Sequence, residues 1–477
     1  MKSYVIFCHT VKESVIFMLK RKIDEFLIQW KKNPDHKPLI IKGARQTGKT
    51  TSVRYFAKNH YDHLIEINFA EKPQYRQIFN DGYDPDSIIR NITVLDPDAV
   101  FVPGKTLIFF DEIQAYMEAT VSLKFFSQDG RYDVICSGSS LGIHYKEVSS
   151  VSVGFKEDYD MYSLDFEEFL WTCGYQESFT DNILQNILTL KPYSSLMMNR
   201  MNQLFMDYIL TGGMPAITEK FVENHNFSGI LRMQKQIFKD YDDDIGKYTE
   251  GLETARIRNV YRHIAPQLGK ENHKFQITKL GHGARASQYE GTQEWLSDAG
   301  VVNICYCAQN LSLPLKGNED PSNYRIYFAD TSLLLASLDE ESQEDLRVNK
   351  NLGVYKGAMY ENFAAEALTK EGYDLFFYRS QDARTELDFL IRIGDQIVPI
   401  EVKAGKTKAR SLNTVISDPK IPLITWGLRF SSGNIGISDH VVTLPYFTLF
   451  LLKRALQNRE GTPLNNTIMD FTASDDQ

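Results

Sequence analysis

The sequence predicts a multidomain α/β protein whose N-terminal region contains a parallel β-sheet. Short apolar segments alternate with helical segments between residues 20 and 136, which is the pattern of repeated strand–helix units. The length of 477 residues corresponds to about three domains at roughly 150 residues per domain. With 43% hydrophobic and 24% charged residues, the composition is globular and excludes collagen-like, coiled-coil and wholly disordered chains.

The N-terminal elements follow from hydrophobic periodicity. Apolar side chains at helical spacing indicate that the first element is an amphipathic helix, and short apolar runs indicate the strands. The expected elements are a helix over 20–32, a strand over 38–41, a helix over 52–59, and strands over 63–68, 105–110 and 132–136. Ligands bind at the carboxyl ends of strands in such sheets, so polar residues that follow these strands are candidates for a site.

The rest of the chain changes character twice. Residues 185–270 read as helical, and residues 275–308 show a helix, a glycine-containing turn, a helix and a strand, an order that resembles a winged helix-turn-helix. After a charged segment near 340–351, the pattern predicts a helix over 354–371 and strands near 374–379, 386–393 and 396–403. A second α/β region is therefore expected at the C-terminus.

Charge and cysteine content limit the function classes. With 53 Lys and Arg against 62 Asp and Glu, the net charge is −9, so any nucleic-acid contact must come from a local basic patch. The five cysteines are scattered, which favours a reducing compartment. Cys305 and Cys307 alternate on an expected strand and are interpreted as buried structural residues. No apolar run reaches the roughly 18 residues that a membrane span needs, so we expect a cytoplasmic protein that does not bind membranes.

A complete phosphate-binding motif follows the first strand. The residues from Gly43 to Thr50 read GARQTGKT and match G-x-x-x-x-G-K-[ST], with a strand before the motif and a helix after it. Backbone N–H groups of such a loop and the start of the next helix surround phosphates. Lys49 is expected to reach the β- and γ-phosphates of ATP, and the Thr50 hydroxyl to bind Mg²⁺. The expected nucleotide-contacting residues are Gly43, Ala44, Arg45, Gln46, Thr47, Gly48, Lys49, Thr50, Thr51 and Ser139.

Two carboxylates follow the strand at 106–110. Asp111 is expected to hold Mg²⁺ through water, and Glu112 to polarise the attacking water, so that the site hydrolyses ATP. The next strand runs into SGSS at 137–140, where Ser139 either senses the γ-phosphate or belongs to an ordinary turn. The sequence does not identify a charge-stabilising arginine among Arg45, Arg54 and Arg131, each of which is equally readable as a surface residue.

These motifs together resemble the prokaryotic AAA-type ATPases that carry a C-terminal DUF4143 domain. The resemblance runs from about residue 19 to 450 and rests on GARQTGKT, FFDEIQ (109–114), SGSS, MYSLDFEEFL (161–170), Tyr208 with GGMP (212–215), YFAD (327–330), ELDFLI and IEVKAG. One departure is Phe155 after Gly154, where relatives often carry a basic residue. Either Lys156 substitutes for that residue, or turnover is slow. Residues 1–18 lie outside the pattern, and Met18 is an alternative start.

A second constellation of charged residues lies in the C-terminal region. Glu361 is expected on a helix, Asp388 on a strand, and Glu401 and Lys403 two residues apart on the next strand, so that they share one face. This resembles the PD-(D/E)xK nuclease core, in which Asp388 and Glu401 would hold Mg²⁺ and Lys403 would position or activate water. The alternative is an exposed strand face with alternating charges, and such a fold also serves as a binding platform without cleavage.

Local basic residues are the candidate contacts to DNA or RNA. They flank the C-terminal constellation and also occur in the winged-helix-like region, although a solvated surface is an equal alternative in both places. The residues are Arg379, Arg384, Lys406, Lys408 and Arg410, and Arg256, Arg258, Arg262, Lys270, Lys274, Lys279 and Arg285. The acidic run at 240–244, DYDDD, is interpreted as a solvated helix end rather than a cation site.

The expected architecture combines these parts. It comprises an extension over residues 1–18, an AAA P-loop ATPase domain over 19–175, a helical lid over 176–250, a winged-helix-like region over 251–338, a restriction-endonuclease-like DUF4143 domain over 352–455 and a flexible tail over 456–477. The expected function is a Mg²⁺-dependent ATP hydrolase coupled to nucleic acid. One alternative is an ATP-gated switch whose C-terminal domain binds a protein or nucleic acid without cleavage, and another is a nuclease whose access ATP controls.

Overall fold

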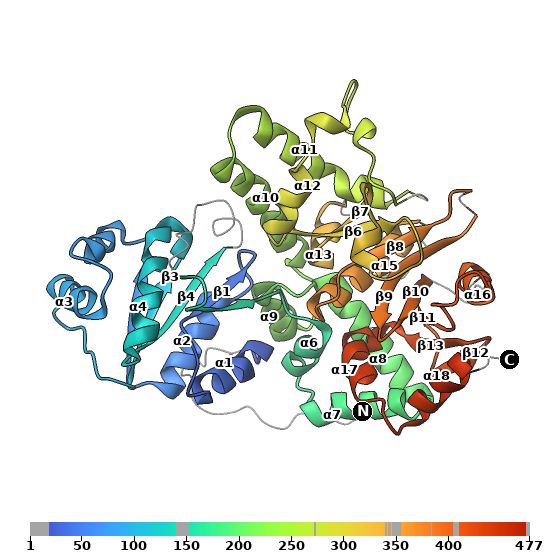
Figure 1. Cartoon of the computed structure of the whole chain (residues 1–477), viewed down its shortest axis with the longest axis horizontal. Coiled ribbons are helices and arrows are strands. Elements are labelled where there is room, and N and C mark those ends of the chain that lie inside the picture. The colour runs from blue at the N-terminus through green and yellow to red at the C-terminus, as the bar shows by residue number, and fades with distance from the viewer. Residues whose placement is uncertain are drawn as a thin grey trace.

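The computed structural model describes residues 19–139, 152–270, 273–338, 341, 345, 354–382, 384–403 and 410–473. Figure 1 shows the N-terminal residues as one lobe built around a small sheet, and the remainder as a larger lobe of helices and a second sheet. The architecture is α/β, with a five-stranded sheet, a helical middle and a C-terminal mixed sheet.

The N-terminal sheet has the strand order β2-β3-β4-β1-β5, and every neighbouring pair is parallel. This confirms the parallel sheet expected from the alternating pattern. The strands are β1 (Leu39–Gly43), β2 (His63–Asn68), β3 (Thr106–Asp111), β4 (Asp133–Ser139) and β5 (Glu157–Asp160). The helices are α1 (Lys22–Lys32), α2 (Lys49–His60), α3 (Pro85–Leu95) and α4 (Ser122–Asp129).

Both faces of this sheet are covered, which explains why its central strands are apolar throughout. Leu107 and Phe109 of β3 pack in a core with α1 and α2, whereas Ile108 and Phe110 pack in a second core with α3 and α4. Successive strand residues point to opposite faces, so a strand buried on both sides has no polar alternation. All six residues of β3 are buried.

Helices connect the two sheets. They are α6 (Phe166–Thr172), α7 (Glu177–Leu188), α8 (Ser195–Thr211), α9 (Pro215–Asn224), α10 (Ile230–Tyr248) and α11 (Gly251–Leu268), followed later by α12 (Thr292–Asp298) and α13 (Thr331–Ala336). Their apolar faces join the same buried core as the C-terminal sheet. The middle of the chain therefore packs as one body with the C-terminal region.

The second sheet contains eight strands in the order β12-β13-β11-β10-β9-β8-β6-β7. The strands are β6 (Val302–Ala308), β7 (Glu319–Phe328), β8 (Phe376–Arg379), β9 (Glu386–Ile393), β10 (Gln396–Lys403), β11 (Gly427–Ser431), β12 (Gly436–Ser438) and β13 (Val441–Pro445). Helix α15 (Val354–Lys370) precedes β8, and α16 (Arg410–Ile416) connects β10 to the parallel strand β11.

Two expectations about the second half need correction. The winged-helix-like region over 251–338 is not separated from the C-terminal domain, because its hairpin β6–β7 continues the C-terminal sheet through parallel pairing of β6 with β8. The flexible tail over 456–477 is instead helical in α17 (Leu452–Gln457) and α18 (Pro463–Ala473). Leu464 and Ile468 of α18 are buried in the core, which holds this segment in place.

None of the helices in the described ranges combines the length and hydrophobicity that a membrane span requires. Cys305 and Cys307 are buried free thiols on β6, in agreement with a structural role.

Candidate nucleotide site and the C-terminal carboxylates

The phosphate-binding loop lies where the sequence placed it, between the end of β1 at Gly43 and the start of α2 at Lys49. The Lys49 Nζ donates hydrogen bonds to the carbonyl oxygens of Gly43, at 3.0 Å, and Ala44, at 2.7 Å. Gly48 has a φ of 97°, a conformation that favours glycine. A Cβ on Gly43 would lie 2.1 Å from the carbonyl oxygen of Met161, so only glycine fits there.

Lys49 is a buried cation held by neutral acceptors. Burial lowers the pKa of Lys49 to about 8, against the opposing effect of the Glu112 and Asp111 carboxylates. A phosphate group would supply the negative charge that the carbonyl oxygens lack. The lysine is therefore arranged to favour binding of an anion.

Asp111 lies at the centre of a polar cluster at the carboxyl edge of the sheet. The Thr50 hydroxyl lies 3.2 Å from both Asp111 carboxylate oxygens, and the Asn68 amide donates a hydrogen bond of 3.1 Å to one of them. The Ser137 hydroxyl also donates to Asp111. Mg²⁺ prefers oxygen ligands, and a hydroxyl beside a carboxylate fits its coordination, with Thr50 and Asp111 as the residues that would hold it.

Asn68 and Ser137 had no assigned role in the sequence analysis. Both lie at or near the carboxyl ends of the two strands that flank β3, and in a parallel sheet these ends meet at one edge. Their position at the strand ends is the signal that could have identified them.

Glu112 is held by a short turn after β3. Its φ is 51°, in the left-handed region, and its carboxylate accepts a hydrogen bond from the Gln114 side-chain amide. The Gln114 carbonyl oxygen accepts a hydrogen bond of 3.2 Å from the backbone N–H of Ser139. Within the described part of the chain, the buried Ser139 hydroxyl has no hydrogen-bond partner, so it is available to a ligand.

The three arginines considered as charge-stabilising groups all pair with carboxylates. Arg45 lies 3.1 Å from Asp244, Arg54 pairs with Glu66, and Arg131 pairs with Asp86 and Asp129. Lys156, considered as a substitute at the departure from the family pattern, contacts Asp158 at 2.6 Å. Each of these four cations therefore has an acidic partner within the protein.

Arg21 is a buried cation beside the loop that the sequence did not reveal. Its guanidinium donates to the carbonyl oxygens of Thr47 and Tyr162, at 2.8 Å each, and pairs with Glu168 at 3.0 Å. Its partners are 26 to 147 residues away in the chain, so no local sequence pattern predicts that Arg21 contacts the loop. Arg21 fixes the loop to the segment that follows β5.

Helix α10 contacts the loop from the other side. The Tyr241 hydroxyl donates a 2.8 Å hydrogen bond to the carbonyl oxygen of Arg45, and the Gln46 amide donates a 3.1 Å bond to Asp240. Asp244 pairs with the Arg45 side chain. The DYDDD run is therefore not a solvated helix end but a contact of the middle region with the phosphate loop.

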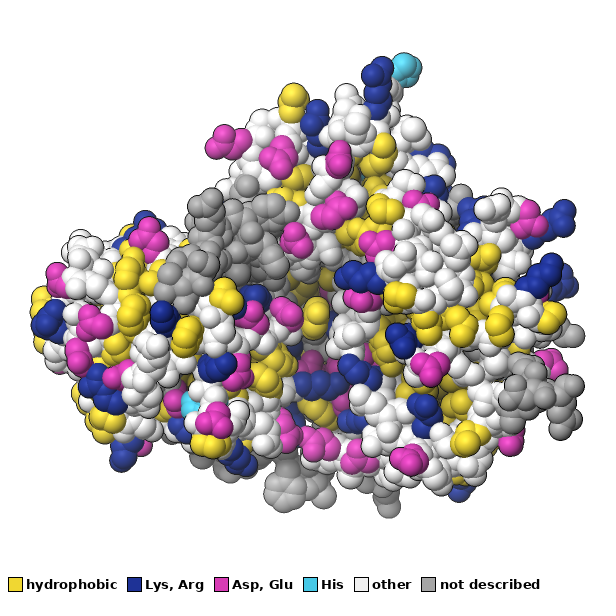
Figure 2. Space-filling model, viewed as in Figure 1, with side chains coloured by type: hydrophobic (Ala, Val, Ile, Leu, Met, Phe, Trp, Pro, Cys, Tyr) yellow, Lys and Arg dark blue, Asp and Glu magenta, His cyan; other side chains and the backbone are white. Residues whose placement is uncertain are grey.

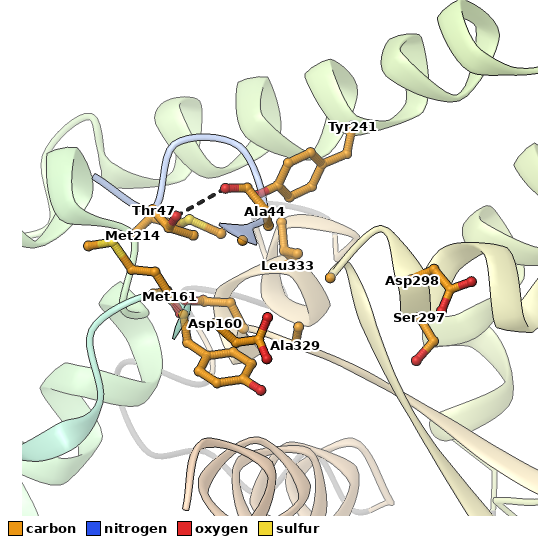
Figure 3. Close-up of a pocket in the computed structure, with 15 residues that line it drawn as sticks. Ala44, Thr47, Asp160, Met161, Met214, Tyr241, Ser297, Asp298, Ala329 and Leu333 are labelled. Atoms are coloured by element: carbon orange, nitrogen blue, oxygen red, sulfur yellow. Dashed lines mark hydrogen bonds between the residues drawn. The ribbon is translucent and has the colours of Figure 1, made fainter. Parts of the chain in front are cut away.

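A cavity of about 210 Å³ lies beside this contact. Figure 3 shows Tyr241 above the loop residues Ala44 and Thr47, with Met161 and Met214 on one side and Asp298 on the other. The cavity thus lies where the N-terminal lobe, the middle helices and the C-terminal lobe meet.

The four C-terminal candidate residues also come together. The Lys403 Nζ lies 3.1 Å from a Glu401 oxygen and 3.9 Å from an Asp388 oxygen, and Asp388 accepts a 2.9 Å hydrogen bond from the Val402 backbone N–H. Burial, followed by the Glu361 charge, raises the pKa of Asp388 to about 7. One oxygen of the buried Glu401 has no hydrogen-bond partner among the described residues.

Three further side chains enter this cluster from the middle region. His273 lies 2.7 Å from Glu361, the Tyr327 hydroxyl lies 3.3 Å from the same oxygen, and buried Arg325 lies 3.7 Å from it. Arg325 also pairs with Glu386. The carboxylates are thus already paired with internal cations, and no group of three or more metal-ligating side chains suited to a metal ion occurs in the described ranges.

The basic patches are partly neutralised. Arg379 pairs with Glu386 at 3.6 Å and Arg384 with Asp382 at 3.4 Å. In the middle region, Arg262 binds Asp242. Lys406 and Lys408 lie outside the described residues.

Helix α15 joins the C-terminal cluster to the N-terminal lobe. Glu361 faces the cluster, whereas Lys370 of the same helix contacts the segment after β5. The Lys370 Nζ donates to Glu366, at 2.6 Å, to the Ser163 hydroxyl, at 3.0 Å, and to the Leu164 carbonyl, at 2.9 Å. All of these groups are buried or nearly so, which makes the contact well defined.

Charged side chains gather along the junction of the two lobes. Figure 2 shows acidic and basic side chains at a hollow in the middle of the molecule. A groove of about 1070 Å³ lies between the N-terminal lobe and the C-terminal helices. Lys22 pairs there with Asp165 and Glu167, and Arg454 also pairs with Glu167. The opposite charges in this groove are largely matched to each other.

Comparison with known families divides the chain into three parts. Residues 35–170 match the family model described as an AAA domain, residues 202–344 match a domain of unknown function, DUF8612, and residues 356–445 match a second one, DUF4143. The N-terminal part therefore contains a region that matches an AAA domain and carries the phosphate-binding loop described above. A single model covers residues 202–250 of the expected helical lid together with the whole winged-helix-like region. The nuclease-like nature of the C-terminal domain stays a prediction.

Among solved structures, the chain is similar to the Walker-type ATPase PABY2304 of Pyrococcus abyssi, at 13% identity and a TM-score of 0.42, over 67% of this chain and 96% of that one. It is also similar to the Holliday junction branch migration motor RuvB of Thermotoga maritima, at 11% identity and a TM-score of 0.29, over 69% and 98% of the two chains. Similarities of this size say nothing about the activity of the present chain. No curated protein matches the sequence.

Proposed function

We propose that this chain is a Mg²⁺-dependent ATPase whose turnover is coupled to nucleic acid through its C-terminal domain. The observation that carries the ATPase assignment is the convergence of Lys49, the Thr50–Asp111 pair and Glu112 at one edge of a parallel sheet. An AAA domain match over residues 35–170 supports it.

The residues have separate roles in this proposal. The loop N–H groups and Lys49 bind the phosphates, while Thr50 and Asp111 hold Mg²⁺, which supplies compensation for the charge on the β- and γ-phosphates. Glu112 orients a water molecule toward the γ-phosphorus and accepts its proton. Ser139, whose hydroxyl has no partner among the described residues, is the candidate contact to the γ-phosphate.

A continuous set of contacts supports coupling between the lobes. Met161 packs against Gly43 of the loop, and its N–H donates a 2.7 Å hydrogen bond to the Lys42 carbonyl. Two and three residues later, Ser163 and Leu164 contact Lys370 of α15. Glu361 lies nine residues before Lys370 on that helix, about 14 Å along its axis at 1.5 Å per residue. A nucleotide-dependent shift of the loop has a direct route to the C-terminal cluster.

Turnover assays test this proposal. Phosphate release is measured for wild-type protein with Mg²⁺, with and without a panel of DNA and RNA, beside Lys49→Ala and, as a matched control, the exposed Lys58→Ala in the same helix. We expect Lys49→Ala to abolish tight ATP binding in calorimetry and Lys58→Ala to bind like wild type. Undiminished affinity of Lys49→Ala would refute the phosphate site. Nucleic acid that neither binds nor changes turnover would refute the coupling.

A second candidate function has a specific observation in its favour. Because Arg325, His273 and Lys403 already pair with the C-terminal carboxylates, an ATP-gated switch that binds a partner without cleavage suits this cluster. Labelled linear and branched DNA and RNA, incubated with Mg²⁺ or Mn²⁺ and ATP, distinguish the candidates. Cleavage that is lost in Lys403→Ala would favour the nuclease reading, and binding without cleavage would favour the switch.

A further inference from the structure

Gln114 bridges two parts of the nucleotide site. Its side-chain N–H donates to the Glu112 carboxylate, and its side-chain carbonyl accepts the backbone N–H of Ser139. Gln114 is buried, with 4% of its surface exposed, so contacts within the protein determine the position of its side chain. One amide group therefore connects the end of β3 to the end of β4.

Glu112 depends on such a restraint because it lies outside any helix or strand, so regular backbone hydrogen bonds do not hold it in place. It lies in the left-handed region immediately after β3, at the start of the short 3₁₀ turn Ile113–Ala115, and it is only partly buried. A non-glycine residue in this conformation costs of the order of 1 kcal/mol and persists when neighbouring contacts enforce it. The turn brings Gln114 back to contact a residue only two positions earlier.

The bridge also reaches the phosphate loop. Ser139 lies opposite Gly43 in the β1–β4 register, and the Ser139 hydroxyl is buried without a partner among the described residues. Glu112 directly follows Asp111, whose carboxylate lies 3.2 Å from the hydroxyl of Thr50, the residue after Lys49. The order Gly43, Ser139, Gln114, Glu112 thus runs from the loop to the residue assigned to the attacking water.

We infer that Gln114 is a positioning residue for ATP hydrolysis. It holds the Glu112 carboxylate at a fixed position relative to Ser139 and the γ-phosphate. This inference rests on the proposed ATPase function. In the step concerned, the water oxygen forms a bond to the γ-phosphorus and the bond from that phosphorus to the bridging oxygen breaks, with its electron pair leaving on ADP. The water proton passes to Glu112. Gln114 touches neither water nor nucleotide and acts only through Glu112.

Two substitutions separate the halves of the bridge. Gln114→Ala removes both hydrogen bonds, whereas Gln114→Glu keeps an acceptor for the Ser139 N–H and replaces the donor to Glu112 by a second carboxylate. We expect kcat to fall about ten- to a hundredfold in both variants, as for other small misplacements of a reacting group, with little change in KM or in ATP affinity. The exposed Gln128→Ala in α4 is the matched control and is expected to behave like wild type.

The separation of kcat from ATP affinity provides a readout that a merely structural role would not move. Loss of packing would lower ATP affinity and thermal stability together with kcat, whereas a misplaced Glu112 carboxylate lowers kcat alone.

The outcomes distinguish this inference from the function beneath it. If wild-type protein neither binds nor hydrolyses ATP, the proposed function fails. If wild-type protein hydrolyses ATP and both Gln114 variants match it in kcat, only the positioning role is overturned. A parallel loss of ATP affinity and thermal stability in both variants would assign Gln114 to packing and would also overturn it. A lowered kcat with retained ATP affinity and thermal stability would establish the role.

Discussion

The two charged sites of this molecule differ in what their cations bind. In the N-terminal lobe, buried Lys49 is held by two carbonyl oxygens, which carry no net charge, so an anion is the stronger partner. In the C-terminal lobe, Arg325, His273 and Lys403 already pair with carboxylates. The first site therefore favours a charged ligand, whereas the charges of the second are largely matched by internal ion pairs. A motif of charged residues does not by itself reveal which condition applies.

Substitution of Glu112 gives the largest expected effect and tests the ATPase side of this comparison. Glu112→Gln removes the proton acceptor but leaves the loop, Lys49 and Asp111 in place. We expect ATP binding to persist and kcat to fall by about 100- to 10,000-fold, the range for loss of a general base. Calorimetry and single-turnover phosphate release provide the two values. Turnover at the wild-type rate would remove Glu112 from this role.

Removal of Arg325 tests whether the C-terminal carboxylates depend on their internal cations. Arg325→Leu leaves buried Glu361 and partly buried Glu386 without this partner, and loss of one member of a buried pair costs about 3–5 kcal/mol. Urea unfolding is the measurement, with the exposed Arg384→Leu as the control expected to change stability little. If Arg325→Leu unfolds at the same urea concentration as wild type, the C-terminal carboxylates do not depend on Arg325 to neutralise their charge.

The His273–Glu361 pair adds a pH dependence with a defined sign. Burial opposes the charge on His273, but its contact with Glu361 raises the pKa of His273 above the ordinary 6.5; its stabilising effect is complete below that pH and lost as pH rises through the folded pKa. Burial opposes the charge on Glu361 as well, but the contact with His273 lowers the pKa of Glu361 below 4.5, so its effect disappears as pH falls through the lowered value. The pair therefore stabilises most between pH 4.5 and 6.5.

Comparison of wild type with His273→Gln checks this window. We expect the variant to unfold with a free energy lower by about 2 kcal/mol near pH 5.5, the scale of a hydrogen bond to a charged group. The difference should shrink as pH rises above neutrality. A difference that stays constant from pH 5.5 to 9 would show that His273 contributes packing rather than charge.

The smallest effect is expected where the middle region touches the phosphate loop. Tyr241→Phe removes one hydrogen bond to the Arg45 carbonyl, with an expected cost of about 1 kcal/mol in unfolding free energy. Because the Arg45–Asp244 pair is retained, ATP affinity should change only a few fold. Thermal unfolding with and without ATP measures both. A loss of ATP binding as complete as that of Lys49→Ala would mean that α10 forms the nucleotide site rather than supporting it.

The parts that sequence reasoning predicted share a physical basis. Lys49 and Thr50 belong to one contiguous motif, and Asp111 reaches them because parallel strands end at one edge. The same reasoning placed Asp388, Glu401 and Lys403 together from strand periodicity. Local spacing and sheet geometry are sufficient for such contacts.

The contacts that sequence reasoning missed depend on long-range packing or on an irregular turn. His273 meets Glu361 across 88 residues, and Tyr241 meets the loop across 196 residues. Gln114 lay within a quoted motif, but its contact needs the left-handed conformation of Glu112, which composition does not reveal. The winged-helix reading had the right kinds of element but could not show that β6 would pair with β8.

That pairing has a consequence for how the polypeptide can be divided. A fragment that begins at α15 would keep the DUF4143 match but lose β6 and β7, so that β8 would become an edge strand with unpaired N–H and C=O groups. Phe376 and Phe377 on β8 would be exposed at this new sheet edge. Exposed edge strands promote self-association. The two family-defined segments are therefore expected to fold as a single unit.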